Sequence, residues 1–146
     1  MIRIVFLFLF SSSLFANFYH YEGSWVGKGK YVSSTSSVIC SNYNITISVT
    51  NSVLNIFDWN YICRGEETRP STHSLIIKKG KLINSNNEII GSIDSDKILI
   101  KDPNSLFEVF LKVYETNLFV IESHVDQAQE KFMIGILETM YESSIA

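Results

Sequence analysis

Two pairs of side chains are spaced so that they could do chemistry together. His124 and Asp126 lie two positions apart, so on a strand they share a face, where a carboxylate could orient an imidazole. Asp94 and Asp96 flank one serine and could offer oxygen ligands to a calcium ion. A local hydrogen bond and ordinary turn preference explain these pairs more simply. We therefore predict no catalytic residue, no metal site and no cofactor, and we expect that the protein is not an enzyme.

The two cysteines, Cys40 and Cys63, are placed to form a disulfide. A hairpin that turns on Asn51-Ser52 places residues opposite each other when their numbers add up to 103, as 40 and 63 do. Directly opposed residues in an antiparallel ladder lie about 4.5–5.5 Å apart at their Cα atoms, which a disulfide can bridge. The predicted bond closes a loop of about 24 residues and should stabilise the fold by about 3 kcal/mol.

The first 16 residues have the features of a cleavable secretory signal. One arginine, Arg3, precedes an apolar run from Ile4 to Phe10, and the small residue Ala16 ends the segment. This run is much shorter than the roughly 20 residues needed to span a bilayer. We therefore expect an exported protein, periplasmic or secreted, that is soluble and does not span the membrane once residues 1–16 are removed. Residues 17–146 are expected to form a single all-β domain in an oxidising compartment.

Apolar and polar residues alternate with a period of two along most of the chain, which is typical of β-strands. Turn residues such as Asn51-Ser52, Lys79-Gly80 and Ser95-Asp96 separate the alternating segments. We predict an all-β antiparallel meander of about 8–10 strands that closes into a small barrel to hide its edges, with a two-sheet β-sandwich as the alternative. The expected strands cover residues 19–32, 38–50, 53–63, 73–78, 81–84, 88–94, 97–101, 106–115, 118–125 and 131–141.

The charge of the chain argues against nucleic acid as a partner. The formal net charge is −3 at pH 7, from 12 basic and 15 acidic residues. A phosphate-binding surface needs clustered lysine and arginine. The densest basic segment, Lys78, Lys79 and Lys81 around Gly80, is better explained as a solvated hairpin tip.

The segment Gly23-Ser24-Trp25-Val26-Gly27-Lys28-Gly29-Lys30-Tyr31 resembles the G-x-W opening strand of lipocalin-like (calycin) barrels. The resemblance implies that the tryptophan closes one end of a barrel and that the interior holds a small apolar ligand. The residues expected to line the ligand site are Trp25, Tyr31, Tyr43, Ile45 and Ile47.

A second candidate surface lies on the hairpin that carries the cysteines. Its expected core face pairs Val49 with Leu54 and Ile47 with Ile56, so the alternating aromatics Phe57, Trp59 and Tyr61 should lie on the opposite face. Three exposed aromatic residues would form a platform for a sugar or a partner protein. The alternative is a bulge near Asp58 that turns these aromatic side chains inward.

Two functions from different classes remain. The favoured hypothesis is an exported lipocalin-like barrel that binds a small apolar molecule. The alternative is a protein-interaction or enzyme-inhibitor module of the cell envelope, with an envelope or extracellular protein as its partner, acting through surface loops or the aromatic platform. Tyr61-Ile62-Cys63-Arg64-Gly65 resembles the Y-x-C-x-G stretch of small periplasmic lysozyme inhibitors.

Overall fold

The segments with predicted alternation form antiparallel strands along most of the described chain. The computed structural model describes residues 18–101, 103, 107–126 and 129–139, with the backbone alone over 124–126 and 129–139. The predicted signal segment, 1–16, lies outside these residues. The strands are β1 (Gly23–Val32), β2 (Ser37–Thr50), β3 (Val53–Cys63), β4 (Glu66–Thr68), β5 (His73–Lys78), β6 (Lys81–Ile83), β7 (Ile89–Ile93), β8 (Ile98–Lys101), β9 (Phe107–Tyr114), β10 (Asn117–Asp126) and β11 (Gln129–Thr139).

Two local predictions were wrong. The first strand does not begin at Tyr19, because Tyr19–Tyr21 form one turn of 3-10 helix in which the Glu22 N–H donates to the Tyr19 carbonyl at 3.1 Å. The segment after Cys63 contains a strand that the sequence did not predict, β4, which forms a short hairpin with the end of β3. Each of these two elements has only three residues, which is too short for a periodic pattern to identify it.

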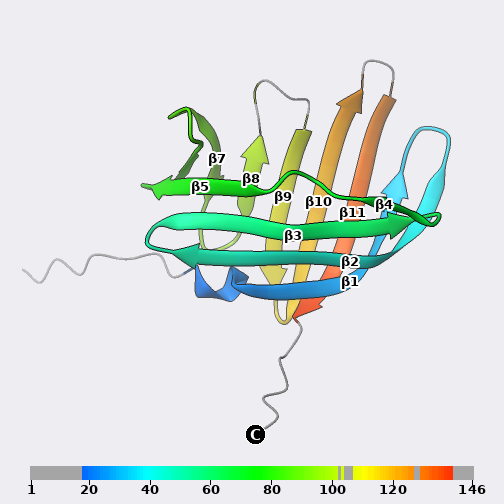
Figure 1. Cartoon of the computed structure of the whole chain (residues 1–146), viewed down its shortest axis with the longest axis horizontal. Helices are drawn as coiled ribbons and strands as arrows, with labels where there is room; N and C mark the ends of the chain where they lie inside the picture. Colours follow the sequence, from blue (N-terminus) through cyan, green and yellow to red (C-terminus); the bar gives the residue numbers. More distant parts are fainter. Residues whose placement is uncertain (1–17, 102, 104–106, 127–128, 140–146) are drawn as a thin grey trace, which may run out of the picture.

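The strands form a barrel that is closed except at one seam, which confirms the predicted fold class. Each neighbouring pair is antiparallel, β1 pairs with both β2 and β11, and the order continues through β10, β9, β8, β7, β6 and β5 to β3, which pairs back to β2. Figure 1 shows β1, β2, β3 and β5 crossing the front of the molecule, with β8 to β11 running steeply behind them. Such near-perpendicular layers are typical of orthogonally packed β folds.

The seam lies between β3 and β5. Val53–Ile56 of β3 pair with His73–Ile76 of β5, whereas Tyr61–Cys63 at the other end of β3 pair with β4. The intervening residues of β3, 57–60, have no ladder partner on this side within the described chain. The chain that connects β4 to β5 runs beside them without joining the sheet.

Tight turns set the register of the hairpins. Asn51 and Ser52 have φ angles of 51° and 60°, and Lys79 and Gly80 have φ angles of 50° and 73°. Positive φ at both central residues defines a type I′ turn, whose twist matches that of the flanking strands. These two predicted turns therefore connect β2 to β3 and β5 to β6 with two residues each.

The barrel interior is an apolar core with a single buried charged residue among the described side chains, Glu122. The predicted core pairs are confirmed, since Ile47 lies opposite Ile56 and Val49 opposite Leu54. The core consists of Tyr21, Trp25, Cys40, Tyr43, Ile45, Ile47, Leu54, Ile56, Trp59, Tyr61, Leu75, Leu82, Ile90, Ile93, Ile98, Ile100, Val109, Leu111, Leu118 and Val120. Aliphatic side chains dominate one part of it, and the larger aromatic side chains of β2 and β3 fill another.

Candidate functional site

Two residues of the β2–β3 hairpin interrupt its ladder. Thr46 pairs with Phe57, but the next recorded pair is Asn44 with Asn60, so β3 contains one extra residue at this point. Nearer the open end Ser41 pairs with Ile62, which means that β2 in turn contains one extra residue. Asp58 and Asn42 have left-handed φ angles of 48° and 51° and account for these two bulges. Asparagine and aspartate tolerate this conformation better than most residues do.

The two bulges offset each other, so the predicted disulfide forms. One extra residue on each strand restores the numbering relation of the hairpin beyond the bulges, and Cys40 lies directly opposite Cys63. The two residues are bonded, with their Cα atoms 4.3 Å apart. The disulfide therefore joins β2 and β3 at the end of the hairpin that lies opposite the Asn51-Ser52 turn.

The aromatic platform predicted on the outer face does not exist. Trp59 and Tyr61 are only 2 % and 5 % exposed, and Phe57 alone of the three lies outside, with 38 % of its surface exposed. The bulge at Asp58 is the physical reason, because one extra residue reverses the side-chain alternation that follows it. The alternative of an inward turn near Asp58 is thus correct. The protein-interaction hypothesis loses the aromatic surface on which it partly rested.

The aromatic side chains that turn inward surround a buried carboxylate. Tyr43 donates a hydrogen bond to Oε1 of Glu122, and Tyr61 donates to Oε2 at 3.3 Å. The Trp59 indole N–H donates to the Tyr43 hydroxyl oxygen at 3.0 Å. We call these four residues the Glu122 cluster. A carboxylate is costly to bury unless donors satisfy its oxygens, and the tyrosine hydroxyls provide them.

The Glu122 cluster changes the acidity of its tyrosines. Burial, reinforced by the charge of Glu122, raises the pKa of Tyr43 well above its usual value of 10.0 and also raises the pKa of Tyr61. Both hydroxyls therefore keep their protons through the physiological pH range and remain hydrogen-bond donors. The two rings are stacked at 5.1 Å between centroids, which fixes the direction of both hydroxyls.

A chain of ring contacts connects the cluster to the surface. The Trp59 ring lies 6.4 Å from His73 and 6.2 Å from Phe107, and the His73 and Phe107 rings are stacked at 6.3 Å. His73 begins β5, at the point where the β3–β5 ladder ends. Its ring therefore stands between the aromatic interior and the seam.

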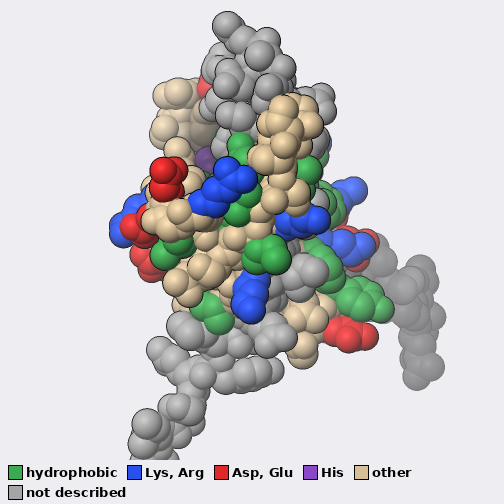
Figure 2. Space-filling view, turned by 90° about the vertical axis from the view of Figure 1, so that its right-hand side faces the viewer, with side chains coloured by type: hydrophobic (Ala, Val, Ile, Leu, Met, Phe, Trp, Pro, Cys, Tyr) green, Lys and Arg blue, Asp and Glu red, His purple; other side chains and the backbone are tan. Residues whose placement is uncertain are grey.

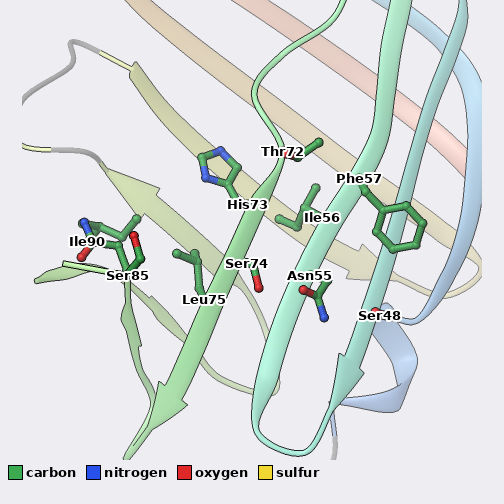
Figure 3. A pocket seen from close by; sticks show the side chains of 11 residues that line it. Ser48, Asn55, Ile56, Phe57, Thr72, His73, Ser74, Leu75, Ser85 and Ile90 are labelled. Atoms are coloured by element: carbon green, nitrogen blue, oxygen red, sulfur yellow. The ribbon is translucent and has the colours of Figure 1, made fainter. Parts of the chain in front are cut away.

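A cleft of about 750 Å³ opens at this seam. Figure 3 shows its lining side chains on β2, β3, β5 and the segments on either side of them. Apolar side chains from the interior form one part of the lining, and hydroxyl and carboxamide groups form the other. The lining residues are Ser48, Asn55, Ile56, Phe57, Thr72, His73, Ser74, Leu75, Asn84, Ser85 and Ile90.

The residues predicted to line a ligand site lie in the barrel interior and not in this cleft. Trp25, Tyr43, Ile45 and Ile47 are buried members of the core, and Tyr31 is half-buried against it. Trp25 also donates its indole N–H to the Tyr21 carbonyl at 2.9 Å, which attaches β1 to the preceding 3-10 turn.

Sequence reasoning missed both the cleft and Glu122. The cleft depends on where β5 leaves β3, which is a non-local property. Glu122 did have a signal: it follows Leu118 and Val120 at a spacing of two, so it occupies the inward phase of β10, where a charged residue is rare.

The Asp94 and Asp96 pair gains no metal-binding role from the structure. The Asp94 carboxylate accepts the backbone N–H groups of Asp96 at 2.7 Å and Lys97 at 2.9 Å, and these bonds lower its pKa. Turn formation thus accounts for this residue. The side chains of His124 and Asp126 lie outside the described residues.

The described residues contain no group of three or more His, Cys, Asp or Glu side chains that could hold a metal ion. None of their helices has the length and apolar character needed to cross a membrane. Comparison with known proteins found no match for this chain among family models, curated proteins or solved structures.

Proposed function

We propose that this protein is an exported, lipocalin-like binding barrel that holds a small molecule in the cleft at the β3–β5 seam. The cleft itself carries the proposal, because its volume of about 750 Å³ lies within the range of roughly 300–1,000 Å³ that is typical of ligand pockets. Export rests on the signal-like sequence of residues 1–16 and agrees with the disulfide.

Three apolar residues that border the cleft, Ile56, Leu75 and Ile90, are only 0 %, 2 % and 6 % exposed, so they close its inner side as part of the packed core. The apolar part of the ligand would instead contact the Phe57 ring, 38 % of whose surface is exposed. Burying further apolar area there is worth about 25 cal/mol per Å². A ligand in this position lies beside the barrel core, so it need not displace the side chains that fill it.

The cleft supports binding better than catalysis. His73 is the one lining side chain that could act as a general base near neutral pH. Its neighbour on β5, Ser74, points to the opposite face of the strand, since successive side chains alternate. The imidazole instead stacks on Phe107, which gives it a place in the aromatic wall of the barrel.

A pair of tryptophan variants on β5 tests the proposal. Ser74 lines the cleft, whereas Ile76 lies two residues further along the same outer face and does not line it. We expect the neutral fluorescent probe N-phenyl-1-naphthylamine to bind the wild type and the Ile76→Trp variant equally. The Ser74→Trp variant, whose indole fills the cleft, should bind about tenfold more weakly. Absence of probe binding, or equal affinity in both variants, would contradict the proposed site.

A further inference from the structure

The lining of the cleft offers few groups that could pair with a charged ligand. None of its eleven lining residues is Lys, Arg, Asp or Glu. The rest of the surface differs, since Figure 2 shows basic and acidic side chains spread over the end of the barrel. A charged ligand entering the cleft would lose hydration and would find at most the His73 imidazole as a charged partner, which is unfavourable. A neutral ligand meets no such penalty.

The polar groups of the cleft are hydroxyls and carboxamides, and most of them make no hydrogen bond within the described part of the chain. Ser48 lies opposite Asn55, and Asn55 lies opposite Ser74, so these three side chains form a row across β2, β3 and β5 (Figure 3). With Thr72 and Ser85 they form no side-chain hydrogen bond to any other described residue. Hydroxyl and amide groups both donate and accept, so together they match the hydroxyl groups of a ligand.

One lining carboxamide is instead fixed in place. The Asn84 Oδ1 accepts the backbone N–H groups of Asn86 and Glu88 at 3.0 and 2.9 Å, and its Nδ2 donates to the Glu88 carboxylate at 2.9 Å. These bonds hold the β6–β7 loop at the side of the cleft opposite the polar row. The cleft therefore has one adaptable polar side and one rigid polar side.

An exposed aromatic ring lies beside the polar row, two residues along β3 from Asn55. The Phe57 ring extends over β2, where its register partner is Thr46 (Figure 3). The face of an aromatic ring carries partial negative charge, which attracts the C–H groups of a saturated ring. A ligand with an apolar C–H face and a rim of hydroxyl groups would use this ring and the polar row together.

We propose that the cleft binds a small neutral carbohydrate, an inference that rests on the proposed binding function. A sugar ring combines the features that the lining selects: no net charge, many hydroxyl groups and a C–H face for Phe57. The hydroxyl rim would take up the bonding capacity of Ser48, Asn55 and Ser74.

The test presents the purified, disulfide-bonded protein to an array of neutral and acidic glycans, followed by titration calorimetry on the best binder. We expect a neutral glycan to bind, with the affinity reduced about tenfold by Asn55→Ala and by Phe57→Ala. Ile39→Ala changes an exposed residue away from the lining and should leave the affinity unchanged.

The outcomes separate the ligand class from the binding function. If N-phenyl-1-naphthylamine binds and Ser74→Trp blocks it, but no neutral glycan binds or competes, the carbohydrate inference fails and the binding function stands. Preference for acidic glycans, or a neutral glycan whose affinity ignores Asn55→Ala and Phe57→Ala, also overturns the inference. If neither the probe nor any glycan binds, both proposals fail.

Discussion

Replacing Glu122 with alanine should strongly destabilise the fold, although a carboxylate in an apolar barrel is itself costly. The hydroxyls of Tyr43 and Tyr61 are buried and donate to this one side chain. Its removal leaves both without that acceptor, and a buried unsatisfied group costs about 1–3 kcal/mol. The two hydroxyls alone predict a loss of about 2–6 kcal/mol in the free energy of unfolding, a large share of the stability of a small domain.

A more conservative change at the same position should cost less. Glu122→Gln keeps the shape of the side chain and one acceptor oxygen, so one tyrosine hydroxyl remains satisfied and the loss should be about 1–3 kcal/mol. Adding Tyr61→Phe to this variant removes one of the dependent hydroxyls. The double variant should therefore be more stable than the sum of the two single changes predicts, by about 0.5–3 kcal/mol.

The measurement is equilibrium unfolding in guanidinium chloride with the disulfide intact. Trp59 belongs to the Glu122 cluster, so its fluorescence reports the region that is changed. Strict additivity of Glu122→Gln and Tyr61→Phe would show that the hydroxyl does not depend on the carboxylate. A Glu122→Ala variant within about 0.5 kcal/mol of the wild type would refute the reasoning outright.

Three further changes test other parts of the structure. The pKa values of Tyr43 and Tyr61 are raised in the folded protein, so the unfolded chain loses these two protons at lower pH than the folded chain does. The free energy of unfolding should therefore be at its full value below about pH 10 and fall above it, by about 1.4 kcal/mol per pH unit for each tyrosine. Tyr61→Phe should reduce this slope, as measured by urea unfolding across the same pH range. Replacing Cys40 and Cys63 with alanine should lower the free energy of unfolding by about 3 kcal/mol, and calorimetry on the oxidised wild type gives the reference. Gly91→Ala should cost about 1–3 kcal/mol and lower the melting temperature, because the added Cβ would lie 2.1 Å from the Leu99 carbonyl oxygen; an unchanged melting temperature would count against the close β7–β8 contact.

The strands could be predicted because the sequence signal for each strand lies within a few consecutive residues. Ile45 and Ile47 alternate with polar neighbours on β2, and type I′ turn residues such as Lys79-Gly80 follow directly after a strand. Period two and turn chemistry are properties of a few consecutive residues, so a single sequence contains them. Closure of the barrel followed from the need to hide sheet edges.

The face of a residue beyond a bulge could not be predicted with the same security. Trp59 and Tyr61 share the phase of Phe57 in the sequence, yet they lie on the other side of the sheet. One left-handed residue, Asp58, decides this, and aspartate is equally common in places where no bulge forms. The disulfide prediction was correct because the second bulge, at Asn42, offsets the first.

The candidate site depends on contacts between segments that are distant in the sequence. Ser48 and Asn84 both line the cleft, but no pattern in the chain connects them. Their proximity results from the point at which β5 leaves β3 and from the path of the β6–β7 loop. The buried Glu122 shows the opposite case, since its place in the inward phase of β10 could be read from alternation alone.

The two bulges also have a consequence for the curvature of the barrel. A regular strand of 14 residues, the length of β2, would extend for about 46 Å, compared with about 26 Å for the 8 residues of β9. Bulges bend a strand and increase its twist, so Asn42 and Asp58 let the long hairpin curve around a narrow core. Deleting Asn42 and Asp58 would restore regular alternation along both strands, because each bulge places two residues opposite a single partner. Every remaining side chain would therefore stay on its present face. The shortened chain would nevertheless have a straighter hairpin, and the barrel would then open more widely at the seam between β3 and β5.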